Sequence, residues 1–263
     1  MSTGNERFNT MAAQWDTNPF VNRASTMALK TLLTHVPKLQ SHHHNPDHPE
    51  QDQGLDVLEV GCGTGLLSFM IAPYVRSLTA VDTAEGMIQA FKQKLAQRPE
   101  VKNLLPVYAM LEDPDDGRIL PDPLSSKEKG EEEDNNKANL APRRFDLVIS
   151  HLVLHHIPSL PQILSTMHGC LKPGGSIALT DFEDFGPEAK RFHPESRMDG
   201  VERHGIRRRD IEAMIKEAGF VDVEVTTAFE LEKDVEKEPG SGIVEGSSPK
   251  MVFPFLICKG RKE

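Results

Sequence analysis

Short apolar segments alternate with amphipathic segments along most of the chain. The apolar segments are rich in Val, Ile and Leu and are bounded by turn residues, which is typical of buried strands. They lie at 55–60, 77–82, 104–109, 145–150, 176–182, 221–229 and 251–258. Apolar residues recur at helical spacing at 65–75, 85–96, 159–170 and 208–218.

This alternation of strands and helices predicts a fold class. A parallel strand needs a crossover helix before its neighbour, and the first five strands are separated by such segments. The seventh strand follows the sixth without a convincing helix, so we expect an antiparallel hairpin. The sequence therefore predicts an α/β fold with a doubly wound, seven-stranded, mostly parallel sheet.

The N-terminal residues and two polar segments do not follow this alternation. Residues 1–40 predict a helical cap. The apolar stripe of this cap consists of Phe8, Met11, Ala12 and Trp15. Residues 41–54 predict a polar linker, and 113–143 a polar insertion within the domain at 55–263. Both polar segments contain too few apolar residues to offset the entropy of ordering, so we expect them to be mobile.

Composition and charge exclude several function classes. The 263 residues carry a net charge of -10, whereas binding to nucleic-acid phosphates requires a basic surface. No apolar run is long enough to cross a bilayer, and the first residues lack the apolar core of a secretory signal. We therefore expect no nucleic-acid partner, no membrane association and a cytoplasmic location.

Cysteine and histidine positions give little sign of a metal or disulfide framework. The three cysteines, Cys62, Cys170 and Cys258, are widely scattered. Four histidines occur in the polar linker, but three of them are consecutive rather than spaced along one face of an element. These are His42, His43, His44 and His48. We predict no metal site.

The first predicted strand ends in a glycine-rich turn with the sequence EVGCGTG at 59–65. Glycines permit a tight turn and allow backbone amides to approach a ligand closely. Dinucleotide-binding proteins use G-x-G-x-x-G, but Leu66 occupies the position of their third glycine, which argues against a NAD-type oxidoreductase. The pattern E-x-G-x-G-x-G resembles the nucleotide loop of class I S-adenosylmethionine (SAM)-dependent methyltransferases.

This resemblance implies SAM as cofactor, S-adenosylhomocysteine as its product, and a Rossmann-like methyltransferase fold. In the family, the glycine loop contacts the methionine part and sugar of SAM, and an acid after the second strand accepts the ribose hydroxyls. Asp82 holds that position, although with Glu85 it also fits a capping box, and we favour ribose binding. The implied cofactor-binding residues are Trp15, Glu59, Gly61, Cys62, Gly63, Asp82, Met87, Met110, Leu111, Ser150 and His151.

The adenine end of the implied site departs from the family pattern. Many relatives have an Asp after the third strand that accepts the adenine amino group, whereas Met110 aligns there. Adenine is then expected to pack on Met110 and Leu111 with backbone contacts. Glu112 and Asp113 are alternative acids, and the sequence does not choose between them.

The segment FDLVISHLVLHHIP at 145–158 resembles the UbiE/COQ5-like and type 11 branches of the family. In those branches, this segment lies beside the reactive methyl group. The resemblance therefore implies that Ser150 and His151 line the SAM pocket. His155 and His156 are assigned to the following turn and core.

Four segments together are similar to the fungal gliotoxin bis-thiomethyltransferases. They are RFNTMAAQWD, GLDVLEVGCGTGLLSFMIAPYVRSLTAVD, ISHLVLHHIP and RHGIRRRDI. Those enzymes methylate the two thiols of reduced epipolythiodioxopiperazines, which implies S-methylation of a small molecule such as dithiol gliotoxin. The alternatives are a C- or O-methyltransferase acting on a quinone or phenolic metabolite, and a SAM-binding regulatory protein without turnover.

Thiol methylation needs little more than a base or a contact that lowers the thiol pKa. His151, His193 and His204 are candidate bases because imidazole titrates near neutral pH. We predict His204 as the catalytic base, since its region commonly covers the active site in this branch. The predicted substrate-binding residues are Phe182, Phe185 and Met198. We expect a small-molecule substrate and a monomer or weak homodimer.

Overall fold

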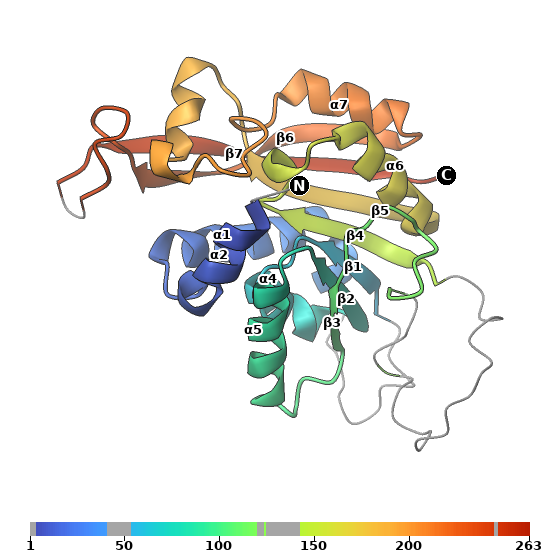
Figure 1. The fold of residues 1–263 in the computed structure, drawn as a ribbon. Coiled ribbons are helices and arrows are strands. Elements are labelled where there is room, and N and C mark those ends of the chain that lie inside the picture. The colour runs from blue at the N-terminus through green and yellow to red at the C-terminus, as the bar shows by residue number, and fades with distance from the viewer. Residues whose placement is uncertain (1–3, 41–53, 120–123, 125–142, 245–246) are drawn as a thin grey trace.

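The computed structural model describes residues 4–40, 54–119, 124, 143–244 and 247–263 (Figure 1). The four histidines of the predicted polar linker lie outside these ranges. No helix in the described ranges is long and apolar enough to cross a membrane.

A seven-stranded sheet forms the centre of the described structure. Its strands are β1 (Asp56–Val60), β2 (Ser77–Asp82), β3 (Leu104–Tyr108), β4 (Phe145–His151), β5 (Leu171–Phe182), β6 (Val221–Asp234) and β7 (Lys250–Arg261). They are arranged in the order β3-β2-β1-β4-β5-β7-β6. The first five pair in parallel, and β7 is antiparallel to both β5 and β6. This arrangement confirms the predicted fold class.

Helices cover both faces of the sheet. The helices are α1 (Gly4–Trp15), α2 (Pro19–His35), α3 (Pro37–Gln40), α4 (Leu66–Ile71), α5 (Glu85–Ala96), α6 (Leu160–Cys170) and α7 (Arg208–Glu217). Short 3-10 helices are η2 (Ala72–Tyr74), η5 (Leu154–His156), η6 (Pro187–Phe192) and η7 (Glu195–Arg197). Helices α6 and α7 lie on one face, and α2, α4 and α5 on the other (Figure 1).

Strand β1 shows why the apolar runs of this sequence become central strands. All five of its residues are buried, as expected for a parallel strand covered on both faces. Leu58 and Val60 belong to the core cluster that contains residues of α6 and α7, whereas Val57 belongs to the cluster on the opposite face. Alternation of side chains along β1 therefore contributes to two hydrophobic cores.

Helix termini agree with the local sequence, with one correction. Asn18 caps α2 by accepting a hydrogen bond of 2.9 Å from the amide of Phe20. Gly219 follows Ala218, the C-cap of α7, with φ +94°, a left-handed conformation that favours glycine. The alternative role of Asp82 in a capping box does not apply, because α5 begins at Glu85 and its N-cap is Ala84.

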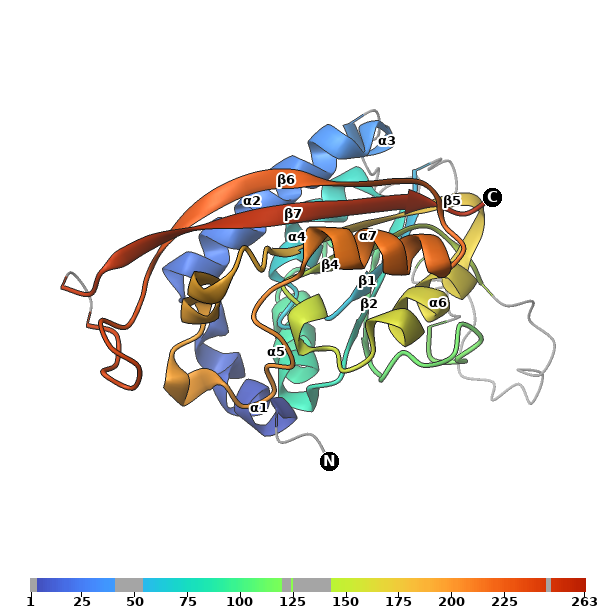
Figure 2. The same ribbon diagram turned by 90° about the horizontal axis from the view of Figure 1, so that it is seen from above.

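The edge strand β6 and its neighbour β7 are longer than the sequence pattern indicated. Strand β6 continues to Asp234 and β7 to Arg261, and the two pair along their whole length (Figure 2). Beyond Phe229, β6 alternates between exposed and partly buried residues, so few apolar positions mark its end. The predicted polar insertion also begins too early at 113, since the described residue Ile119 is fully buried in the core.

Candidate functional site

A cavity of about 1050 Å³ opens at the carboxyl ends of the parallel strands, where β1 and β4 diverge into connections on opposite faces. In open α/β sheets, ligands bind at this switch in strand order. The cap helix α1, the glycine loop, the turn after β4 and the segment after η6 all contribute to the wall. The predicted cofactor residues that line it are Trp15, Glu59, Gly61, Cys62, Gly63, Asp82, Met87, Met110, Leu111 and His151.

The glycine loop lies too close to its neighbours to accommodate side chains. A Cβ atom at Gly61 would lie 2.3 Å from Cγ2 of Val153, and φ at Gly61 is +75°. At Gly65, φ is +84° and a Cβ would lie 2.7 Å from the ring of Phe91. Both positions therefore require glycine for conformation and for space. The loop consequently presents its backbone to the cavity, as a nucleotide loop must.

Two carboxyl groups flank this loop. Asp82 accepts hydrogen bonds of 2.8 Å from the amides of Gly63 and Ala84. Burial raises the pKa of Asp82, although these amides oppose the rise. Burial also raises the pKa of Glu59 to about 8, and the hydroxyl of Ser68 donates to this carboxyl group. Asp82 is thus fixed by the loop that it faces.

Helix α1 closes the cavity beside the glycine loop. The indole Nε1 of Trp15 lies 3.8 Å from the point where a Cβ of Gly63 would be. Asp16 accepts hydrogen bonds from the hydroxyl of Thr64 and, at 2.5 Å, from Nζ of Lys94. The cap is therefore tied to the loop and to α5.

The end of β4 places one predicted residue in the cavity and another behind it. His151 lines the cavity, with Nδ1 2.9 Å from the hydroxyl oxygen of Thr180. Burial lowers the pKa of His151 to about 4, and its Nε2 is buried without a hydrogen-bond partner among the described residues. Ser150 is buried and lies outside the cavity wall, so the structure gives it no direct contact with a ligand there.

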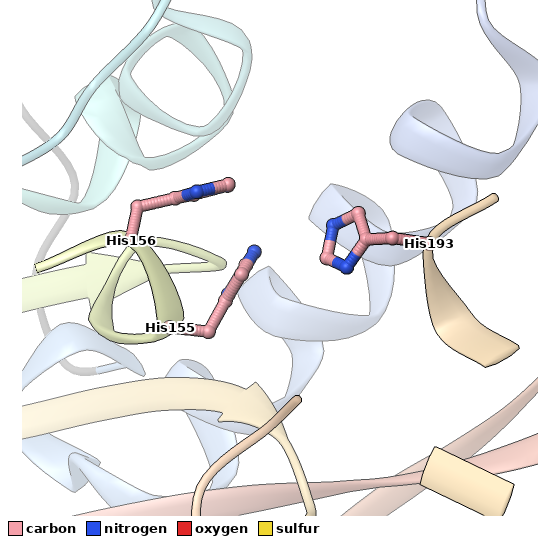
Figure 3. Close-up of side chains that lie close together, drawn as sticks. All are labelled: His155, His156 and His193. Carbon is pink, nitrogen blue, oxygen red and sulfur yellow. The ribbon is translucent and has the colours of Figure 1, made fainter. Parts of the chain in front are cut away.

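Three histidines form a cluster on another part of the wall (Figure 3). The ring centroids of His155 and His156 are 3.9 Å apart, and that of His193 is 5.1 Å from His155. Burial lowers the pKa of His156 to about 3 and holds that of His193 below its usual range. The two adjacent histidines in the connection after β4 are the signal in the sequence, although we predicted that they belong to the turn and core.

The predicted substrate-side residues do not reach this cavity. Phe182 is fully buried and stacks on Phe192 at 3.8 Å between ring centroids, so Phe192 takes its place in the wall. Phe185 lies on the surface against Phe253, at 42% exposure. Two further predicted residues that lie outside the wall are Met198 and the exposed His204. The structure therefore gives no geometric support to these four assignments.

Comparison with known proteins identifies the family. A family model described as a methyltransferase domain matches residues 33–225, well over half of the chain. The chain belongs to this methyltransferase family. Membership confirms the prediction of a methyltransferase at the level of the family. The matched range includes the glycine loop and β4, and it begins after the cap helix α1.

Relatives of this methyltransferase are distant. An uncharacterized methyltransferase of Schizosaccharomyces pombe is 25% identical over 153 residues, which are 58% of this chain and 46% of the relative. Malonyl-[acyl-carrier protein] O-methyltransferase of Brevibacillus brevis is 26% identical over 187 residues, 66% of this chain and 57% of the relative. The chain thus spans about half the length of these curated relatives.

A solved structure shares the fold of this methyltransferase. The N-methyltransferase NodS of Bradyrhizobium japonicum, in complex with S-adenosylhomocysteine, aligns with a TM-score of 0.54 and 14% identity. The alignment covers 99% of both chains. It confirms the Rossmann-like methyltransferase fold.

The cavity of the methyltransferase fits SAM. The glycine loop leaves its backbone open to the cavity, and Asp82 offers carboxylate oxygens suited to hydroxyl groups. Met110 and Leu111 offer apolar surface for a planar ring. The unpartnered Nε2 of His151 is a further polar atom available to a ligand. Because sites for drug-sized ligands range from roughly 300 to 1,000 Å³, a cavity of about 1050 Å³ has room for SAM and a small acceptor.

Proposed function

We propose that this methyltransferase methylates the thiols of a small molecule, of the class of reduced epipolythiodioxopiperazines such as dithiol gliotoxin. The supporting observation is the chemistry of the cavity wall around the histidine cluster. Besides His155, His156 and His193, the cations Arg7 and Lys233 line this part of the cavity. Neighbouring cations lower the pKa of a thiol and stabilise the thiolate, which is the nucleophilic form.

The cofactor side of the proposed site consists of the glycine loop and the ends of β2, β3 and β4. Asp82 would accept the ribose hydroxyls, and Met110 and Leu111 would contact the adenine. When bound, SAM supplies a methyl group on a sulfonium sulfur. The same acid, loop and apolar residues face one cavity, so the described residues supply contacts for each part of the cofactor.

The acceptor side consists of aromatic residues and the histidine cluster. Phe20, Phe192 and Trp15 line the cavity and exclude water from an acceptor bound beside the cofactor. Methyl transfer requires the attacking lone pair to be held in line, and fixed walls supply this alignment. An acceptor that forms a thiolate near neutral pH needs no strong base, which suits buried imidazoles of low pKa.

O-methylation of a phenol or quinol is the second candidate. The relative from Brevibacillus brevis is an O-methyltransferase, and the aromatic wall suits a planar acceptor equally well. A phenol has a pKa near 10 and would depend more strongly on a general base. The imidazoles of lowered pKa in this cavity favour the thiol.

A substrate panel tests the proposal. The protein is incubated with SAM and reduced dithiol diketopiperazines, simple thiols, phenols or quinols, and the products are identified by mass spectrometry. We expect one or two added methyl groups on the dithiols. The Gly61→Ala variant serves as control, because its Cβ would disrupt the cofactor loop and should abolish all turnover. Methylated phenols with unmodified dithiols would show that the thiol proposal is wrong.

A further inference from the structure

The histidine cluster has the composition of a metal site. His155 and His156 are adjacent on η5, and His193 follows η6 directly. One ring nitrogen from each histidine lies within 4.8 Å of the other two, and all three residues line the cavity. Figure 3 shows the three rings directed toward the space between them. Turns after two different elements thus bring three imidazoles together at the acceptor side of the cavity.

Hydrogen bonds fix two of these rings in the orientation that metal binding requires. Nδ1 of His155 lies 2.9 Å from Oδ1 of the buried Asp181, and Nδ1 of His156 donates to the carbonyl oxygen of Gly200 at 2.7 Å. Both acceptors leave the lone pair of the histidine on Nε2. Metal-binding histidines almost always donate their other ring nitrogen to a carboxylate or a backbone carbonyl in this way.

The third histidine carries an unsatisfied polar atom. Nδ1 of His193 is buried and has no hydrogen-bond partner in the part of the chain that the structure describes. A buried polar atom without a partner is unfavourable and uncommon, so it calls for a ligand. A metal ion between the three rings would supply one.

We propose that His155, His156 and His193 bind one Zn²⁺ ion whose fourth position takes a sulfur atom of the acceptor. Three imidazoles with one open position are typical of catalytic zinc sites. Tetrahedral Zn–N bonds of about 2.1 Å place the nitrogens roughly 3.4 Å apart. Rotation of the His193 side chain, whose Nδ1 has no hydrogen-bond partner among the described residues, would bring its ring nitrogen closer to those of His155 and His156. The metal site stands on its own geometry, whereas the sulfur ligand rests on the proposed function.

The charges around the cluster favour an anionic fourth ligand. Arg7 and Lys233 lie close enough to act on His193 electrostatically, and their positive charges would repel a Zn²⁺ ion bound by neutral histidines alone. The negative charge of Asp181, which is hydrogen-bonded to His155, offsets this repulsion in part. A thiolate would balance the remaining positive charge, and thiolate sulfur is a preferred ligand of zinc. On coordination, the thiol releases its proton to solvent; once methylated, the sulfur is a neutral thioether that binds more weakly and can leave.

Zinc titration of the full-length protein, after removal of metal with a chelator, tests the site. Four histidines that lie outside the described ranges are first replaced by serine to prevent their binding zinc. These are His42, His43, His44 and His48. We expect one zinc ion per chain, at least tenfold weaker binding in His156→Asn and His193→Asn, and unchanged binding in the matched control His35→Asn. Metal affinity commonly falls about 10- to 100-fold when the hydrogen-bond partner of a ligand is lost, so Asp181→Asn should also bind zinc more weakly.

The affinity of each variant for S-adenosylhomocysteine reports whether its fold is intact. A variant that still binds S-adenosylhomocysteine but has lost zinc supports the site. The reference is the protein in which only the four histidines outside the described ranges are replaced by serine. Equal zinc affinity in His156→Asn, His193→Asn and this reference protein would overturn the site, as would absence of zinc binding in the reference protein. Replacing zinc by cobalt in the reference protein tests the site without changing any residue of the cluster. We expect the visible absorption of tetrahedral Co²⁺, and its absence would also overturn the site.

Addition of the dithiol separates the two proposals. A new thiolate-to-cobalt absorption band is expected when a reduced dithiol diketopiperazine is added, and no change would overturn the sulfur ligand. Dithiol methylation at an undiminished rate after complete removal of metal would overturn the role of zinc but leave the proposed function intact. A protein that binds zinc through the cluster but methylates phenols and no dithiols would overturn the proposed function and leave the metal site intact.

Discussion

At the scale of single residues, Glu59 should make stability depend on pH. Burial raises its pKa from 4.5 to about 8 in the folded protein. Between these values the folded state keeps a proton that the unfolded state has released, so stability falls as pH rises. In Glu59→Gln, the free energy of unfolding should fall less steeply with pH, by about 1.4 kcal/mol per pH unit. Urea unfolding of the ligand-free wild type and variant from about pH 5 to about pH 8 measures this difference in slope.

The comparison between wild type and variant is needed because Asp82 acts in the same direction. Its pKa is also raised by burial, so part of the pH dependence should persist in Glu59→Gln. Parallel stability curves for the two proteins would show that Glu59 is ionised in the folded state and that its environment is more polar than the structure indicates.

Two histidines distinguish the catalytic residue predicted from the sequence from the residue that the structure places in the cavity. His193 lines the cavity, whereas His204 is exposed and outside the wall. We expect His193→Ala to lower kcat by at least about tenfold, because it removes one of the three imidazoles at the acceptor side of the cavity. His204→Ala should change kcat less than about twofold, because its side chain does not line the cavity. A loss of turnover in His204→Ala with normal SAM affinity by calorimetry would restore His204 as the base.

At the scale of elements, the glycine loop should be sensitive to a methyl group for reasons of space. Gly65 and Gly174 have similar φ values, +84° and +77°, but a Cβ at Gly174 would meet no atom within 4 Å. In both alanine variants, a left-handed backbone at the substituted residue should reduce the free energy of unfolding by roughly 1–2 kcal/mol. Gly65→Ala should reduce it by about 1–3 kcal/mol more than Gly174→Ala, because the ring of Phe91 must move.

Urea unfolding and SAM titration measure both effects. Gly174→Ala should bind SAM normally, since it lies at the opposite end of β5 from the cavity. Equal losses of stability in the two variants would mean that the loop relaxes around the added methyl group.

Sequence patterns predicted the elements best where burial is continuous. The central strands and the loop after β1 were found because parallel strands covered on both faces leave uninterrupted apolar runs. The antiparallel pairing of β6 and β7 was predicted, but the end of β6 beyond Phe229 was not. That end pairs with β7 and contains no fully buried residue, so it leaves little apolar pattern.

Part of the candidate site was predictable because it consists of local sequence features. The glycine loop and the strand ends are recognisable from neighbouring residues, and ten of the predicted cofactor positions line the cavity. The cluster of His155 and His193 arises from tertiary contact between distant segments and has no local pattern. Phe182 was misplaced because adjacent strand residues point to opposite sides, and sequence alone did not fix which side of β5 faces the ligand.

At the scale of the whole molecule, the first helix of the cap is attached differently from the rest, because α2 and α3 contribute Ala28, Leu32 and Leu39 to a large hydrophobic cluster. The two large hydrophobic clusters contain no residue of α1. Helix α1 is instead held by Asn9, which accepts a 2.7 Å hydrogen bond from the amide of Gly86, and by Asp16 with its partners on the loop and α5. A small apolar cluster around Ala12 and Met87 completes the contact. Cap opening should therefore need far less energy than global unfolding.

This separation predicts that ligand affinity can be reduced without unfolding the core. In the double variant Asn9→Ala/Asp16→Ala, α1 loses its contacts with Gly86, Thr64 and Lys94. Its amides should then exchange hydrogen faster while those of β1 and β4 stay protected. Because Trp15 lines the SAM cavity, a loosened cap should weaken SAM binding about tenfold, which corresponds to roughly 1.4 kcal/mol. At a SAM concentration of about 100 times the wild-type Kd, the stabilisation by ligand should fall from about 2.7 to about 1.4 kcal/mol.

The exposed Gln14 on the same helix provides the matched control, since the interaction described at this residue uses its backbone oxygen and persists in Gln14→Ala. Hydrogen exchange and thermal unfolding with and without SAM measure the two effects in one set of samples. If the double variant exchanges faster in α1 but binds SAM as tightly as Gln14→Ala, then cofactor affinity resides in the sheet and the loop alone. If exchange increases equally in β1, then the cap is part of the folding unit, and its contacts stabilise the whole domain rather than the closed cavity.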